Sequence, residues 1–205
     1  MGARVSTLVI ACGALAHEIV ALRRLNDWPH LQVQCLPADL HNRPEKIPEA
    51  VRAKIRAARS RFASIFVAYA DCGTGGLLDA VLREEGVERI GGAHCYEFFA
   101  GSAAFEALTE QELGTFYLTD FLARHFERLI IRGMGIDRHP ELLPMYFGHY
   151  RRLVYLAQTE SPEADAAAQA AAARLGLAYE RRFTGYGELG TSLRAAAEGV
   201  IQWRN

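Results

Sequence analysis

The chain has 205 residues, with 23 Lys or Arg, 24 Asp or Glu and four Cys, and half of its residues are hydrophobic. A formal net charge of −1 at pH 7 argues against nucleic acid or an anionic membrane as the main partner. Its ordinary shares of charged and aromatic residues exclude a disordered chain. No apolar run approaches the ~20 residues of a membrane-spanning helix. The first residues lack the layout of a secretory signal, so we expect a cytoplasmic protein with reduced thiols.

Short β-branched and apolar runs alternate with helical stretches. Helices are predicted between these runs, including a long amphipathic one at Thr115–Arg132, and a last helix at Gly190–Val200 follows the final run. Such alternation is typical of βαβ units with parallel strands. We therefore predict one α/β domain over residues 1–205: a Rossmann-like, mostly parallel sheet of about six strands with helices on both faces, and a helical insertion near 96–150. The predicted strands are Val5–Ala11, Leu31–Leu36, Ser64–Tyr69, Val87–Gly91, Arg152–Gln158 and Leu177–Phe183.

Three cysteines follow predicted strands. Cys12 follows the first, Cys72 the third, and Cys95 the fourth, with His94 beside it; His41 lies in the loop after the second. The carboxyl ends of parallel strands meet at one edge of a sheet, which is where ligands bind in such folds. The sequence therefore predicts that these side chains converge.

Two chemistries fit the convergence. Thiolates and imidazole suit zinc, with Cys12, Cys72, Cys95 and His94 as ligands; an iron–sulfur cluster is the second choice. The wide cysteine spacing lacks a C-x-x-C pair and favours a catalytic over a structural zinc site. Alternatively, Cys72 is a nucleophile activated by a helix N-terminus without any metal. The simplest interpretation remains that the three are small buried side chains at strand ends. We interpret Cys35 as a core residue.

The segment after Cys72 is rich in glycine. Gly73, Thr74, Gly75 and Gly76 fit neither a dinucleotide-binding fingerprint nor a P-loop. A strand, a glycine loop and a helix in this order could hold a small anion of the substrate. The equally good alternative is a tight turn that needs positive φ angles.

Polar residues near these segments complete the candidate site. The candidate catalytic residues are Cys72, Glu97 and His41. We also expect His41, Arg43 and Lys46 to orient an anionic substrate group, unless they belong to a solvated loop and helix start. Glu97 is either a general base or ligand, or a first-turn acid favoured by the helix dipole.

Several long segments also resemble the family catalogued as domain of unknown function 1638. The resemblance implies a bacterial or archaeal protein in the setting of corrinoid-dependent methyl transfer and one-carbon metabolism. It assigns no residue role, and Leu142 replaces the glycine of the Asp-x-His-x-x-Gly element of corrinoid-binding proteins. The matching segments are Cys12–Ala16, Leu40–Ile47, Tyr69–Gly76, His94–Gly101, Gly114–Phe121 and Asp137–Leu142.

Together these observations predict a Cys/His metal-binding protein, a zinc-dependent enzyme acting on a small polar or methylated metabolite. One alternative is an accessory protein that carries a metal or cofactor for a methyltransferase system without turnover; another is a metal-free cysteine enzyme using Cys72. The expected partners are a small-molecule ligand, a methyltransferase or corrinoid protein, and a second copy of the chain. Nucleic acid and membrane are not expected.

Overall fold

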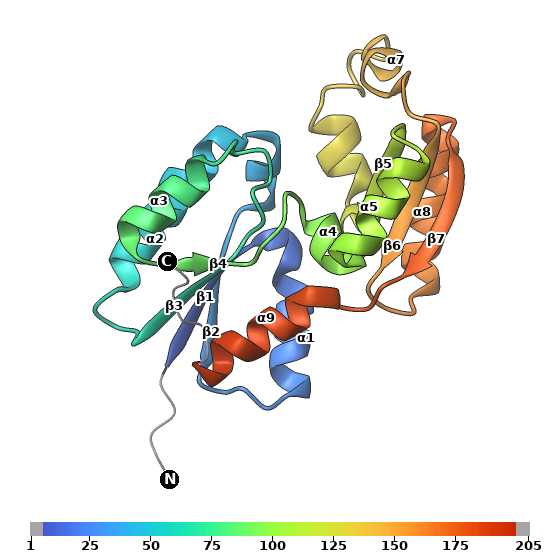
Figure 1. Ribbon diagram of the computed structural model, residues 1–205. Helices are drawn as coiled ribbons and strands as arrows, with labels where there is room; N and C mark the ends of the chain where they lie inside the picture. The colour runs from blue at the N-terminus through green and yellow to red at the C-terminus, as the bar shows by residue number, and fades with distance from the viewer. Residues whose placement is uncertain (1–5, 200–205) are drawn as a thin grey trace. The chain divides into compact units, whose positions relative to one another are not determined.

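Seven strands alternate with helices in the computed structural model, which describes residues 6–199 (Figure 1). The strands form two sheets, and the chain divides into two compact units that are described in turn. The first unit comprises Met1–Phe98 with Glu188–Asn205, and the second comprises Phe99–Gly187. The single domain predicted over residues 1–205 stays a prediction.

The first unit contains a four-stranded sheet in the order β2-β1-β3-β4. All neighbouring strands are parallel. Since β2 and β3 lie on opposite sides of β1, the strand order reverses direction between β1 and β3, and this reversal makes the carboxyl ends of these two strands the expected ligand site. The strands are β1 (Thr7–Cys12), β2 (Leu31–Leu36), β3 (Ser64–Ala68) and β4 (Glu88–Arg89).

Helices cover both faces of this sheet (Figure 1). Right-handed crossovers in opposite directions place α1 on one face and α2 and α3 on the other. The last helix, α9, packs on the α1 face, where the Thr7 hydroxyl donates to the carbonyl of Ala196 at 3.4 Å. The helical elements are η1 (Gly13–Leu15), α1 (Ala16–Leu25), η2 (Ala38–Asn42), η3 (Pro44–Lys46), α2 (Ile47–Ala58), α3 (Leu77–Glu85), α4 (Cys95–Ala100) and α9 (Gly187–Glu198).

The core under α2 and α3 reaches the candidate site. Alternate residues of β1 and β3 point to this face, as the two-residue period of a strand requires; Leu8, Ile10 and Val67 are fully buried and Ile65 is partly buried. At the carboxyl ends of the strands this core includes Tyr69 and is in contact with Cys12 and Cys72. The core includes Leu8, Ile10, Val51, Ile55, Val67, Leu78 and Leu82.

The second unit contains a three-stranded parallel sheet in the order β5-β6-β7. Helices α6 and α8 pack together on one face, while α5 covers the other (Figure 1). A π-helical segment, η4 (Glu127–Arg132), continues α6. The remaining elements are α5 (Ser102–Gln111), β5 (Thr115–Thr119), α6 (Asp120–Arg124), α7 (Leu142–Phe147), β6 (Arg152–Ala157), α8 (Pro162–Leu175) and β7 (Ala178–Phe183).

The fold class is the predicted Rossmann-like α/β arrangement, but the strands are divided differently. The stretch Thr115–Arg132 is not one helix: its first five residues form strand β5. This β-branched and aromatic run is mostly buried, and such a short apolar run does not distinguish a strand from a helix by its period. The region near 96–150 is therefore not an all-helical insertion, and seven strands form two sheets instead of about six forming one. Val5 and Val200, the ends of two predicted elements, lie outside the described residues.

In the part of the chain that the structure describes, no helix is long and apolar enough to cross a membrane.

Candidate functional site

Cys12 and Tyr69 lie side by side at the carboxyl ends of β1 and β3. The two strands are paired with Ala11 opposite Ala68, so the next residue of each chain segment occupies the same level. This is the point where the strand order reverses. The sequence predicted the position of Cys12 correctly but did not single out Tyr69.

The loop after β3 is bonded to the loop after β4. The backbone N–H of Asp71 donates to the carbonyl of Gly92 at 3.0 Å, and that of Cys72 donates to the carbonyl of Ala93 at 2.8 Å. Cys95 follows Ala93 by two residues at the start of α4. The two bonds therefore bring the loop with Cys95 to the loop with Cys72.

The cysteines are close enough to influence each other's titration. Burial raises the pKa of Cys12, and it raises the pKa of Cys72 to about 12, with the Cys12 thiol adding to the effect. Burial also raises the pKa of Cys95 well above its ordinary value, and Cys72 and Cys12 raise it further. Cys35 is half-buried on edge strand β2 and is not a core residue. The three predicted thiols therefore share one neighbourhood and are protonated in it.

A buried hydroxyl lies in the same neighbourhood. Tyr69 is 2% exposed, and its hydroxyl lies near the Cys12 thiol but makes no hydrogen bond of normal geometry to any residue that the structure describes. Burial raises its pKa strongly, with further contributions from Cys12 and Cys72. A buried hydroxyl without a hydrogen bond costs about 1–3 kcal/mol. A polar group bound next to Tyr69 would recover this free energy.

Cys72 has an unusual backbone conformation. Its φ angle is +50°, in the left-handed region that favours glycine. A residue with a side chain in this region costs roughly 1–2 kcal/mol. Such strain is concentrated at functional sites, and here it occurs at a thiol-bearing residue in the loop that follows β3.

Asp71 binds the glycine loop that follows Cys72. Its carboxylate accepts hydrogen bonds from the Thr74 hydroxyl at 2.6 Å and from the backbone N–H groups of Gly76 at 2.9 Å and Gly75 at 3.1 Å. Burial acts to raise the pKa of Asp71, but these bonds and Arg89 outweigh it and lower the pKa. The anion that these backbone groups hold is therefore the chain's own carboxylate. Gly73, Gly75 and Gly76 have positive φ angles, as the tight-turn alternative requires.

The loop after β2 approaches this region from the other side. A Cβ atom placed on Gly73 would lie 3.7 Å from Pro44, so the two loops are in contact. Burial lowers the pKa of His41, and the nearby His94 lowers it further. Arg43 and Lys46 are exposed, as the solvated-loop alternative expects.

Glu97 caps its own loop. Its carboxylate accepts the backbone N–H of Ala93 at 2.8 Å, and it lies 3.1 Å from the position of a Cβ on Gly92. This arrangement matches the first-turn acid that was one of its two predicted roles. By holding Ala93, the residue to which Cys72 donates, Glu97 also supports the thiol cluster.

The donor chemistry of the cluster suits a soft metal ion, since it offers three thiols near a buried hydroxyl, and the exposed His94 precedes Cys95 in the chain. Over residues 6–199, however, no three Cys, His, Asp or Glu side chains stand ready to hold one ion together. The loops bring the thiols near one another without closing them into a ligand set. Binding an ion here would therefore require the cysteine side chains to turn toward it.

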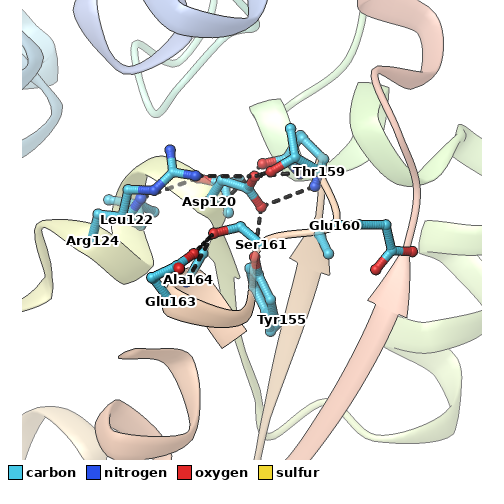
Figure 2. Close-up of polar contacts among 12 residues, drawn as sticks. Asp120, Leu122, Arg124, Tyr155, Thr159, Glu160, Ser161, Glu163 and Ala164 are labelled. Atoms are coloured by element: carbon cyan, nitrogen blue, oxygen red, sulfur yellow. Dashed lines mark hydrogen bonds and ion pairs between the residues drawn. The ribbon is translucent and has the colours of Figure 1, made fainter. Parts of the chain in front are cut away.

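A second buried polar cluster lies in the second unit, where β5 and β6 end. Figure 2 shows the Asp120 carboxylate with Tyr155, Thr159 and Arg124. Tyr155 donates at 2.7 Å, and the Thr159 hydroxyl donates at 2.5 Å. The backbone N–H groups of Gln158 and Thr159 donate at 3.0 and 3.1 Å. Both carboxylate oxygens of Asp120 accept hydrogen bonds from the chain itself. The cluster therefore joins the ends of two strands and is not a ligand-binding site. The sequence gives no signal for this cluster, since Asp120 lies within the helix predicted over Thr115–Arg132.

The two sheets and their connections define a Rossmann-like α/β protein with a thiol cluster at the point where the strand order of one sheet reverses. The chain belongs to the family described as protein of unknown function DUF1638, whose model matches residues 35–193. Cys72 and Cys95 lie within the matched residues and Cys12 precedes them. No curated protein matches the chain. No solved structure matches it either.

Proposed function

We propose that this protein binds zinc through Cys12, Cys72 and Cys95, with His94 nearby, and uses it on a small polar or methylated metabolite. The observation that supports the proposal is the proximity of thiols from the segments after three strands, beside a buried hydroxyl that makes no normal hydrogen bond among the described residues. Sulfur and nitrogen donors together favour zinc over magnesium or calcium. The residues come from three separate loops, which is typical of a site assembled by the fold and open to substrate.

The arginine that lies nearest the thiol cluster in the described part of the chain is already engaged in an ion pair. Arg89 interacts with Cys72, but its guanidinium is held by Asp79 through two hydrogen bonds. Metal binding displaces the thiol protons, so an ion supplies the positive charge that the cluster lacks. Zinc, when bound, would activate a water or a thiol by withdrawing charge.

The remaining residues of the site have roles that follow from their contacts. The Tyr69 hydroxyl is a donor for an atom bound at the ion, because it has no other partner among the described residues. His41 is uncharged at neutral pH, because its pKa is lowered, and it is therefore available to accept a proton. Arg43 is exposed on the neighbouring loop, and we assign it the binding of an anionic group on the metabolite.

A metal-free enzyme with Cys72 as nucleophile has less support. Such a nucleophile is activated by a helix N-terminus, but Gly75 and Gly76 direct their N–H groups to Asp71. The carboxylate itself lies next to Cys72 in the chain and raises the pKa of that thiol. Without an added cation, the surroundings of Cys72 favour the unreactive thiol.

Metal analysis of protein purified without oxygen tests the proposal. We expect about one zinc per chain in the natural protein and a loss of zinc in Cys12→Ser, Cys72→Ser and Cys95→Ser. Cys35→Ser is the matched control and keeps its zinc, since Cys35 lies one residue before the end of β2 and is not among the proposed ligands. Iron with acid-labile sulfide would indicate a cluster instead. Protein that is free of metal and does not take up added zinc would exclude both.

Cobalt substitution distinguishes an enzyme from a metal carrier. Cobalt bound by thiolates absorbs visible light, and the absorption depends on every ligand. We expect a small added thiol to change this spectrum, because a catalytic site keeps one exchangeable position. A spectrum that small ligands leave unchanged would indicate a closed site and favour the accessory protein.

A further inference from the structure

The second unit contains a cavity of about 670 Å³ where β6 and β7 end. One wall is formed by α5 and by Ala100, which precedes it in the chain. The other is formed by residues at the ends of β6 and β7. This volume lies within the ~300–1,000 Å³ that is usual for small-molecule sites. The location, at the carboxyl ends of parallel strands, is also the usual one for ligands in this kind of sheet.

The helical wall of the cavity is lined by small side chains. Ala104, Ala107 and Gln111 follow one another at spacings of three and four residues, so they share one face of α5. Ala104 and Ala107 are exposed although they face this hollow. Small side chains leave room for a flat body to approach the helix closely.

The sheet wall combines an apolar and a cationic side chain. Leu156 of β6 is paired directly with Arg182 of β7, so both lie on the same face of the sheet. The opposite face is marked by Tyr155 and Tyr179, whose hydroxyls bond to Asp120 and to Asp165 of α8. Leu156 and Arg182 therefore belong to the face covered by α5.

The charges on this face leave one positive charge in excess. Glu180 accepts from Arg152 at 3.0 Å and from Arg182 at 2.5 Å, so one carboxylate is shared by two guanidinium groups. Arg152 is also bonded to the Gln111 side-chain oxygen at 3.1 Å, which turns the amide nitrogen of Gln111 away from Arg152. The residues that line the cavity include no acidic side chain. Its polar groups are thus mainly donors.

We infer that this cavity binds a small molecule with a flat apolar body and one anionic group, an aromatic carboxylate or sulfonate in chemical class. The body lies against the alanine face of α5, and the anion pairs with Arg182. The excess positive charge and the donor-rich lining argue for an anion, and the exposed alanines argue for the apolar body. This site lies in the second unit and does not rest on the proposed zinc site.

Two fluorescent probes of nearly the same shape test the inference. 8-Anilinonaphthalene-1-sulfonate carries an anionic group, whereas N-phenyl-1-naphthylamine has the same rings without it. We expect the sulfonate to bind the full-length protein with one site per chain and about tenfold more tightly than the neutral probe. In Arg182→Gln this preference for the anion disappears. Arg174→Gln, an exposed arginine on α8, is the matched control and leaves the preference unchanged.

Filling the cavity should remove binding of both probes. Ala104→Trp and Ala107→Trp each place a large ring in the hollow and weaken binding more than tenfold, while Ala170→Trp on the exposed surface of α8 does not. Far-ultraviolet circular dichroism identifies any variant that fails to fold, and the second tryptophan variant replaces it. The inference is overturned if the sulfonate does not bind, if both probes bind equally well, or if the tryptophan variants bind as the natural protein does.

Discussion

Arg89 and Asp79 form a two-pronged ion pair, with Nε 2.6 Å from Oδ1 and Nη2 3.0 Å from Oδ2. The same guanidinium donates through Nη1 to the carbonyls of Ile90 at 2.7 Å and Gly92 at 3.2 Å. Gly92 in turn accepts the backbone N–H of Asp71. The ion pair between α3 and β4 therefore fixes the loop that leads to Cys95.

Asp79→Asn should destabilise the protein by ~1 kcal/mol at pH 7, since the pair is partly exposed and screened by water. The hydrogen bond from Arg89 lowers the pKa of Asp79 despite its burial. A carboxylate with a lowered pKa contributes its stability above the pKa of the unfolded chain and loses it as the pH falls through the folded value. The difference between the variant and the natural protein should therefore shrink below about pH 4.

Urea unfolding of both proteins at pH 7 and in acid measures this difference. Asp137→Asn, at an exposed aspartate, serves as control and should change little at either pH. An equal effect of Asp79→Asn at both pH values would contradict the assignment of the effect to the ion pair.

Backbone strain at Cys72 predicts an unusual order of stabilities. At a φ of +50° glycine is free of strain, so Cys72→Gly should be more stable than Cys72→Ala by ~1 kcal/mol. Cys12 has a φ of −64°, where glycine has no such advantage. At this position the order should reverse, with Cys12→Gly the less stable of its pair. Thermal unfolding of the four metal-free variants gives both comparisons, and the same order at both positions would refute the strain.

The unpartnered hydroxyl of Tyr69 predicts opposite effects on stability and on metal binding. Tyr69→Phe removes a buried group without a hydrogen bond, so the metal-free variant should be at least as stable as the natural protein. If the hydroxyl donates to an atom bound at the ion, zinc affinity should fall roughly tenfold. Competition with a zinc-binding dye measures that affinity.

Tyr179→Phe is the control for this experiment. The Tyr179 hydroxyl donates to Asp165 at 2.6 Å, so its removal should reduce stability and leave zinc affinity unchanged. A Tyr69→Phe protein that is less stable but binds zinc normally would assign the hydroxyl a purely structural role.

The sequence predicted which residues converge better than it predicted what they contact. Strand ends are recognisable from apolar runs, and parallel pairing then brings Cys12 and Cys72 to the same edge of the sheet, where Cys12 raises the pKa of Cys72. The occupant of the glycine loop was not predictable in this way. Asp71 looks like any polar residue in a turn, and only the three-dimensional path of the loop directs Gly75 and Gly76 at its carboxylate.

Strand β5 was not recognised from the sequence because it is defined by its pairing with a strand far away in the chain. Thr115–Thr119 is followed directly by the helical residues Asp120–Arg124, so apolar residues continue at spacings that suit a helix. What makes the first five residues a strand is their pairing with Arg152–Leu156. The division into two sheets depends on the same pairing, and periodicity alone does not contain it.

Asp120 should be the most sensitive position of the second unit. It is 0% exposed and accepts from the hydroxyls of Tyr155 and Thr159 and from the backbone N–H groups of Gln158 and Thr159. In Asp120→Asn an amide N–H₂ faces one of these donors, so the variant loses bonds and gains a repulsion. We expect a loss of about 3 kcal/mol in the free energy of unfolding. Hydrogen exchange should locate the effect in the amides of Gln158 and Thr159.

Asp165→Asn provides the contrast, because Asp165 also accepts a tyrosine hydroxyl, but its side chain is 28% exposed. Water can replace the lost interactions there, so this variant should lose less than ~1 kcal/mol. The difference between the two variants measures how much burial adds to the same contact between an aspartate and a tyrosine. A loss at Asp120 as small as the one at Asp165 would show that the donors around Asp120 find other partners when the carboxylate is removed. The cluster in Figure 2 would then not hold the ends of β5 and β6 together.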